Sequence, residues 1–223
     1  MAEIFPVAHI YTEFPTKFGI PRQSGLAKTS GRIVFCPEFR SPEAVRGLEG
    51  YSHLWLIWEF SENKDKSASL TVRPPRLGGN VRMGVFATRS PFRPNPIGLS
   101  SVRLVEISEN ETDGKFLVVA GAEILDGTPI YDIKPYLKYT DSHPDAIGGF
   151  ADGALSYKLT LEFPSELISK VPDADRATVT TLLENDPRPA YKNEPDREYG
   201  MKYSDYEIFF KVDGEVLTVT GVK

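Results

Sequence analysis

The stretch Gly84–Ser100, GVFATRSPFRPNPIGLS, carries the strongest indication of the fold. A short apolar run leads into a loop stiffened by three prolines, and a second apolar run begins at Leu99. Similar short runs, rich in β-branched and aromatic residues and bounded by Gly, Pro, Asn or Asp, span residues 31–36, 52–60, 83–88, 99–107, 115–125 and 155–163. No helical pattern of about 10–15 residues separates them, which argues against a doubly wound parallel sheet and predicts an antiparallel β-barrel or sandwich.

The sequence changes character after Phe163. Residues 165–171 and 173–184 have a helical pattern, and residues 206–212 and 215–220 flank Asp213-Gly214, a strong hairpin signal. The run just before them, 155–163, alternates as a half-buried antiparallel strand does. We therefore expect a β domain over residues 1–164 and a small α+β domain over residues 165–223.

Charge is unevenly distributed along the 223 residues. The 26 Lys and Arg residues and 31 Asp and Glu residues give a net charge of -5, which taken alone disfavours a nucleic-acid partner. The forty residues from Lys66 to Val105 nevertheless contain no acid and seven bases, Lys66, Arg73, Arg76, Arg82, Arg89, Arg93 and Arg103. The window is therefore +7 and the remainder is -12. The basic window predicts an anion-binding surface. The alternative is a solvated loop whose arginines pair with carboxylates from elsewhere in the chain.

Several classes of site lack support in the sequence. His9, His53, His143 and the lone Cys36 do not have metal-ligand spacing, so we expect no metal and no intramolecular disulfide. Gly-x-Ser-x-Gly, Walker and strand-linked Gly-x-Gly-x-x-Gly motifs are missing. No run approaches the roughly 18 apolar residues of a membrane span, and the start has no basic segment of a signal peptide. We expect a cytoplasmic protein.

The motif from Gly84 to Ile107 resembles the TsaA-like, or TrmO, family of tRNA methyltransferases. Six further segments strengthen the resemblance, in the order and spacing of the bacterial two-domain form: IPRQSGL (20–26), AVRGLEGYSHLWLI (44–57), TVRPPRLGGN (71–80), DGTPIYDIKPYL (126–137), DPRPAY (186–191) and YGMKYSDYEIFFKV (199–212). The resemblance covers nearly the whole chain.

The resemblance implies a fold and a reaction. Proteins of this kind bind S-adenosylmethionine on an antiparallel β-barrel and not on a Rossmann sheet. They act as homodimers on the tRNA anticodon stem-loop, where they methylate N6 of threonylcarbamoyladenosine at position 37, just 3′ of the anticodon. Two alternatives stay open: a non-catalytic module that binds S-adenosylmethionine or RNA, and a methyltransferase of the same fold with a different acceptor.

The resemblance also implies a cofactor site. Its positions are Arg22, Gln23, Ser24, Gly25, Ser61, Glu62, Arg89, Leu99, Asp126, Gly127, Thr128 and Pro129. Arg89 is expected to bind the methionine carboxylate, and Leu99 to pack on the adenine or, alternatively, in the protein core. Asp126 is the candidate base, with Tyr131 and Asp132 as rivals. An ordinary type I or I′ turn is the alternative interpretation of residues 126–129.

RNA contacts are expected from the basic window. The candidates are Arg73, Arg76, Arg82, Phe92, Arg93 and Asn95, in which Phe92 stacks on a base and the arginines contact phosphates. Arg188 and Tyr191 would extend this footprint onto the C-terminal domain.

Overall fold

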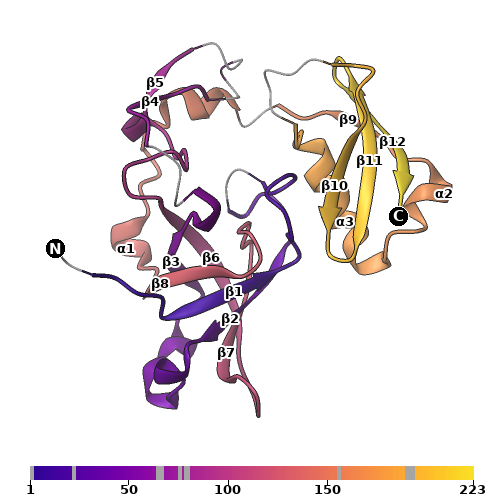
Figure 1. Ribbon diagram of the computed structural model, residues 1–223. Coiled ribbons are helices and arrows are strands. Elements are labelled where there is room, and N and C mark those ends of the chain that lie inside the picture. Colours follow the sequence, from indigo (N-terminus) through magenta and orange to yellow (C-terminus); the bar gives the residue numbers. More distant parts are fainter. Residues whose placement is uncertain are drawn as a thin grey trace.

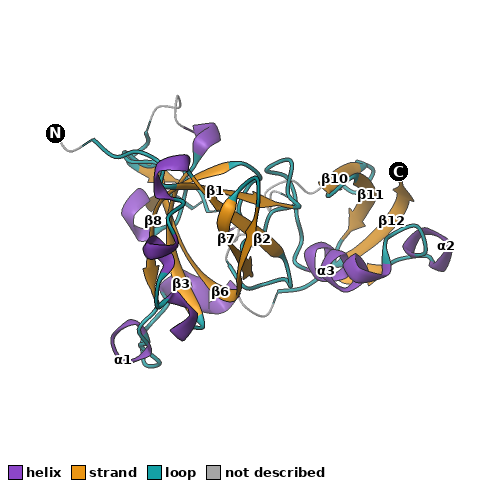
Figure 2. Cartoon of the chain, turned by 90° about the horizontal axis from the view of Figure 1, so that it is seen from below, coloured by secondary structure: helices purple, strands orange, loops and turns teal. Residues whose placement is uncertain are grey.

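The N-terminal unit is a closed barrel. The computed structural model describes residues 3–21, 24–63, 68–74, 77, 81–154, 157–188 and 194–223. Within these ranges six antiparallel strands follow one another around the barrel in the order β1-β2-β7-β6-β3-β8 (Figures 1 and 2). The strands are β1 (Ala8–Thr12), β2 (Ser30–Phe35), β3 (His53–Glu59), β6 (Ile97–Asn110), β7 (Gly114–Ala120) and β8 (Thr128–Pro135). The prediction of a mainly β chain with an antiparallel barrel is confirmed.

Alternate residues of these strands fill the barrel. Ile10, Ile33, Leu54, Leu117 and Ile130 are all 0% exposed, and they belong to one continuous apolar cluster. Because successive side chains of a strand point to opposite faces, each strand contributes every second residue to this core.

Trp58 shows how closely the barrel is packed. Its indole lies against Gly98, where an added Cβ would lie 2.3 Å from a ring atom. Its Nε1 donates a hydrogen bond to the Ser100 hydroxyl at 3.1 Å. Glycine at position 98 is therefore required for the ring to fit.

Three connections of the unit lie at one end of the barrel. Strands β1, β3 and β7 finish at this end, and β2, β8 and β6 start there, because neighbouring strands are antiparallel. The connections are residues 13–29, 60–96 and 121–127. We call this the loop end of the barrel.

The connection 121–127 crosses the loop end from β7 to β8. Ala122 and Ile124 are buried in the barrel core, at 0% and 1% exposed. Backbone hydrogen bonds fasten the connection at both ends, since the Gly121 amide donates to the Thr29 carbonyl and the Gly127 amide donates to the Ile10 carbonyl, each at 2.9 Å. The segment therefore covers the end of the barrel.

The connection 60–96 forms a lobe beside the barrel (Figure 1). It contains the two-stranded sheet of β4 (Thr71–Val72) and β5 (Met83–Gly84) and the 3-10 turns η4 (Ser61–Asn63) and η6 (Val85–Ala87). The strand predicted over residues 83–88 is thus wrong beyond Gly84, because the chain turns into η6 there.

The opposite end carries shorter elements. Between β2 and β3 lie the 3-10 turns η1 (Pro37–Phe39), η2 (Pro42–Val45) and η3 (Leu48–Gly50). After β8 come α1 (Lys138–Asp141) and the 3-10 turn η7 (Gly149–Ala154), which lead to the C-terminal unit.

The C-terminal unit is a four-stranded sheet with two helices. Its order within the described residues is β10-β11-β12-β9. The elements are β9 (Thr160–Glu162), α2 (Ser165–Ile168), α3 (Asp173–Glu184), β10 (Tyr199–Tyr203), β11 (Tyr206–Asp213) and β12 (Val216–Val222). The predicted helix over 173–184 and the hairpin at Asp213-Gly214 are confirmed.

Strand β9 differs from its prediction. It is three residues long and pairs in parallel with β12, not antiparallel as the alternating pattern over 155–163 indicated. The reason is that α2, α3 and the β10–β11 hairpin intervene between β9 and β12, so β12 returns in the same direction. The expected boundary at residue 164 falls between β9 and α2, so the C-terminal sheet includes a strand from before it.

The connection 13–29 joins the two units. Phe14 and Ala27 are buried in the core of the C-terminal unit, and Phe18 and Ile20 pack against it. Met201 occupies the space that a side chain at Gly19 would need, with Cγ only 2.4 Å from the Cβ position. This connection is therefore part of both units.

Candidate active site

The predicted cofactor segments converge on the loop end of the barrel. Ser24 and Gly25 lie in the connection 13–29, Ser61, Glu62 and Arg89 lie in the connection 60–96, and Leu99 lies at the start of β6. Residues 126–129 join the third connection to β8. Arg22, Gln23, Arg76 and Tyr191 lie outside the described residues. Barrel topology thus brings together segments more than a hundred residues apart in sequence.

Asp126 closes the corner between β1 and β8. Its Oδ1 accepts a hydrogen bond from the Thr12 amide at 2.9 Å, and its own amide donates to the Phe14 carbonyl at 2.9 Å. Gly127 has a φ of 72°, which favours glycine, and the Thr128 hydroxyl donates to the Leu125 carbonyl at 2.7 Å. The segment is therefore a structural turn that also presents an exposed carboxylate at the loop end.

The two rivals of Asp126 have different surroundings. Tyr131 is the extra residue of a β-bulge, because Ile57 pairs with Asp132 while Trp58 pairs with Ile130. Burial first, and then the hydrogen bond to Glu59, raise the pKa of Tyr131 to about 12. Asp132 is bound by Lys134, whose Nζ lies 2.8 Å from Oδ2.

Glu59 is a residue of the site that sequence reasoning missed. It is 8% exposed at the end of β3, where it accepts the hydrogen bond of the Tyr131 hydroxyl. The available signal was a single acid near the end of the apolar run LWLIWEF, which needs a hydrogen-bond or charged partner in a buried strand.

Leu99 and Glu62 have clear structural settings. Leu99 is 54% exposed, whereas its neighbours Gly98 and Ser100 are buried, so the core-packing alternative for Leu99 is wrong. Glu62 forms an ion pair with Lys17 at 3.0 Å, and Lys17 also donates to Asn63 Oδ1 at 2.8 Å. Lys17 thereby links the connection 60–96 to the connection 13–29.

The predicted RNA surface lies on the lobe 60–96. Arg73, Arg82 and Asn95 are exposed, and Phe92 is 44% exposed. Arg93 is half-buried, and its Nη1 donates to the Thr88 carbonyl at 3.1 Å, so it braces the proline-rich loop.

The same lobe exposes several large apolar side chains. Phe86 is 76% exposed on η6, within the motif GVFATR, and was not among the residues predicted to contact RNA. Leu70 and Val81 are 77% and 50% exposed. Aromatic and aliphatic surface among arginines is suited to contact with unstacked bases.

Comparison with known proteins identifies the family. The model of the tRNA-methyltransferase O N-terminal domain matches residues 9–142, and the model of the TrmO C-terminal domain matches residues 156–223. The chain belongs to the TrmO family. The family resemblance drawn from the sequence motifs is therefore confirmed.

Relatives and solved structures agree with this assignment. A tRNA (adenine(37)-N6)-methyltransferase of Escherichia coli K12 is 39% identical over 212 residues, covering 91% of this chain and 90% of the relative. Another of that name, from Eikenella corrodens, is 42% identical over 77% of this chain and 97% of its own length. A crystal structure of TrmO from Pseudomonas aeruginosa matches with a TM-score of 0.79 and 31% identity, over 100% of this chain and 99% of that one.

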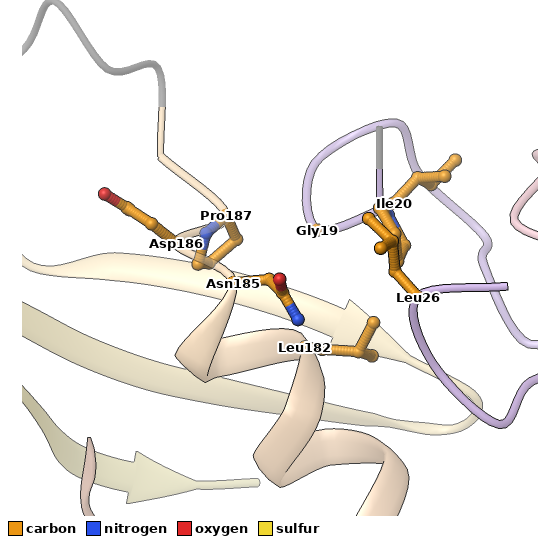
Figure 3. Close-up of a pocket in the computed structure, with 8 residues that line it drawn as sticks. Gly19, Ile20, Leu26, Leu182, Asn185, Asp186 and Pro187 are labelled. Atoms are coloured by element: carbon orange, nitrogen blue, oxygen red, sulfur yellow. The ribbon is translucent and has the colours of Figure 1, made fainter. Parts of the chain in front are cut away.

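A small hollow separates the connection 13–29 from the end of α3. Figure 3 shows Gly19, Ile20 and Leu26 on one side and Leu182, Asn185 and Pro187 on the other. Its volume of about 20 Å³ holds about one water molecule, far less than a nucleoside-sized ligand requires. In this structure the hollow between the two TrmO units is therefore too small to hold a nucleoside.

Over the described ranges, no three His, Cys, Asp or Glu side chains converge as metal ligands do. No helix there is both long enough and apolar enough to cross a bilayer.

Glu123 is a second residue of this TrmO chain that sequence reasoning missed. It lies within the apolar run AGAEIL and is only 6% exposed. Its Oε1 accepts a hydrogen bond from the Ala27 amide at 2.9 Å. Burial raises the pKa of the Glu123 carboxyl from 4.5 to about 7, although the amides of Ala27, Gly25 and Leu26 lower it in part. Its partners are main-chain groups, which leave no signature in a sequence.

The raised pKa of Glu123 predicts a pH-dependent stability. Because the folded state holds the proton more tightly than the unfolded chain does, the contribution of Glu123 is fully present below its unfolded pKa of 4.5 and is lost as pH rises through about 7. Glu123→Gln has no such proton. We expect its free energy of unfolding, relative to wild type, to rise by about 3 kcal/mol between about pH 4 and about pH 8.

Urea denaturation across this pH range measures the effect. Glu111→Gln, on an exposed turn, controls for the loss of one negative charge. A difference between Glu123→Gln and wild type that stays constant with pH would contradict the prediction.

Proposed function

We propose that this chain is an S-adenosylmethionine-dependent methyltransferase that methylates N6 of threonylcarbamoyladenosine at tRNA position 37. The observation that carries the proposal is the similarity over nine-tenths of both chains to a relative named tRNA (adenine(37)-N6)-methyltransferase. A second relative, from Pseudomonas aeruginosa and 42% identical over 92% of this chain, is named a putative S-adenosylmethionine-dependent methyltransferase. The threonylcarbamoyl acceptor, a homodimer and a cytoplasmic location are predictions that rest on the family resemblance.

The residues at the loop end fit this cofactor chemically. Arg89 is exposed there, and a guanidinium is the natural partner of an amino-acid carboxylate. Leu99 offers exposed apolar surface to a purine, and residues 24–25 and 126–129 offer backbone groups to the polar remainder. When bound, S-adenosylmethionine supplies the methyl group from its sulfonium centre.

The reacting nitrogen must lose a proton. It belongs to a urea-like group and is a poor nucleophile, so a carboxylate that accepts the proton as the nitrogen attacks lowers the barrier. Asp126 is exposed at the loop end and fits this role. Tyr131, with its pKa of about 12, stays a phenol at neutral pH, and Asp132 is paired with Lys134.

The lobe 60–96 supplies the surface for RNA. The target base must leave the anticodon-loop stack to reach a methyl donor, and exposed aromatic rings can stack on it or on a neighbour. Phe86 and Phe92 present such rings, and Arg73 and Arg82 are exposed on the same lobe for phosphate contacts.

A direct assay tests the proposal. The protein is incubated with S-adenosylmethionine and tRNA that carries threonylcarbamoyladenosine, and the digested nucleosides are analysed by mass spectrometry. We expect a methyl group on this nucleoside and none on tRNA that lacks the threonylcarbamoyl group. Binding of S-adenosylmethionine without turnover would favour the non-catalytic alternative, and methylation elsewhere would favour a different acceptor.

Asp126→Asn tests the base. Asparagine keeps an oxygen that can accept the Thr12 amide, so the corner of the barrel should persist while the proton acceptor is lost. We expect kcat to fall about 10²- to 10⁴-fold at saturating tRNA and cofactor. Asp132→Asn is the matched control and should stay within about twofold of wild type. Near-normal turnover of Asp126→Asn would show that Asp126 is not the base.

The double variant Arg73→Ala/Arg82→Ala tests the RNA surface. Each arginine that neutralises a phosphate contributes close to one to the slope of log Kobs against log salt. We therefore expect the slope to fall by about 1 to 2 and tRNA affinity to decrease at low salt. Lys202→Ala/Lys211→Ala, two exposed positions of the C-terminal sheet, is the control. An unchanged slope in the arginine variant would show that Arg73 and Arg82 do not contact tRNA phosphates.

A further inference from the structure

Glu123 is directed out of the barrel by the alternation of the segment that carries it. Ala122 and Ile124 on either side are buried in the barrel core, and an extended chain sends the intervening side chain the opposite way. There Oε1 of Glu123 accepts the Ala27 amide at 2.9 Å. The amides of Gly25 and Leu26 lie near enough to lower the pKa of this carboxyl in part, but Oε2 is buried and accepts no hydrogen bond within the described part of the chain.

The Ala27 amide makes the hydrogen bond to the carboxyl, and the amides of the two preceding residues lie close by in the same loop. Gly25 has a φ of 83°, the left-handed conformation that turns consecutive amides toward one side. The left-handed backbone at Gly25 thus lies one residue before Leu26 and two before Ala27, whose amide binds the buried Glu123.

The two main chains also touch next to this carboxylate. A Cβ added at Gly121, whose φ is 76°, would lie 3.2 Å from Cα and 3.3 Å from N of Gly25. The Gly121 amide donates to the Thr29 carbonyl at 2.9 Å. Residues 25–29 are thus held along the segment that covers the barrel end.

Other contacts hold the connection 13–29 at different points. Phe14 and Ala27 are anchored in the C-terminal core, and Lys17 is paired with Glu62. At Gly25 and Leu26 the barrel provides the Glu123 carboxylate. An apolar side chain at position 123 would leave the amide of the buried Ala27 without this partner, which is costly.

We propose that Glu123 is a positioning residue of the methyl-transfer site: its carboxylate holds the main chain of residues 25–27 and thereby sets the place of Ser24 and Gly25 in the cofactor site. The inference rests on the proposed function. Because Glu123 also precedes Asp126 by three residues on the covering segment, it connects the segment that carries the candidate base to the cofactor loop.

Glu123→Gln tests the proposal with matched measurements. Gln is nearly isosteric and keeps an oxygen that can accept the Ala27 amide, but it is uncharged, so the hydrogen bond loses its charged acceptor. We expect the Kd and KM for S-adenosylmethionine to rise about tenfold, with kcat at saturating cofactor within about twofold of wild type. Glu162→Gln, which replaces an exposed acid on β9, should change neither constant.

Hydrogen exchange of the protein without cofactor provides an independent readout. We expect the amides of Gly25, Leu26 and Ala27 to exchange about tenfold faster in Glu123→Gln, with those of β11 unchanged. Unchanged loop exchange, or faster exchange with an unaltered cofactor Kd, would overturn the positioning role. Failure of the wild-type protein to bind S-adenosylmethionine would instead overturn the proposed function.

Discussion

The pairing of β1 with β8 is the contact on which the rest of the structure depends. It is short, with three residue pairs, yet it closes the barrel and leaves no free edge between the first and last strands. Two hydrogen bonds, from the Thr12 amide to the Asp126 side chain and from the Gly127 amide to the Ile10 carbonyl, continue the contact between β1 and the turn that precedes β8. The residues that close the barrel are therefore the same ones that present the candidate base. Fold and site share a single corner.

Closure also determines where charge accumulates. In an antiparallel barrel each long connection must return to the end from which it left, so the arginine-rich lobe 60–96 lies at the same end as residues 24–25 and 126–129. A net charge of -5 is therefore compatible with an RNA partner, since the acid-free window 66–105, with seven bases, belongs to this connection and to β6, and the acidic excess lies in the rest of the sequence. The acidic remainder disfavours nonspecific binding of RNA to other faces.

Local patterns were sufficient to predict much of the fold. The short β-branched runs indicated the barrel strands, helix α3 followed its amphipathic pattern, and Asp213-Gly214 marked the last hairpin. The pattern could not indicate the direction of β9, because a parallel pairing depends on elements that follow it. The bulge at Tyr131 depends on register between distant strands. Glu123 and its amide partner are 96 residues apart, and main-chain partners are invisible in composition.

The connection 13–29 has a consequence for how the protein can be divided. Phe14 and Phe18 of this connection pack into the core that the C-terminal sheet and α3 form. The connection nevertheless begins at barrel strand β1 and ends at barrel strand β2. A barrel prepared without the C-terminal unit would expose the apolar side of the connection 13–29 at its loop end, and such exposed apolar surface promotes aggregation. The C-terminal unit therefore buries the apolar side of this connection in its own core, and removing the unit would expose that side to solvent.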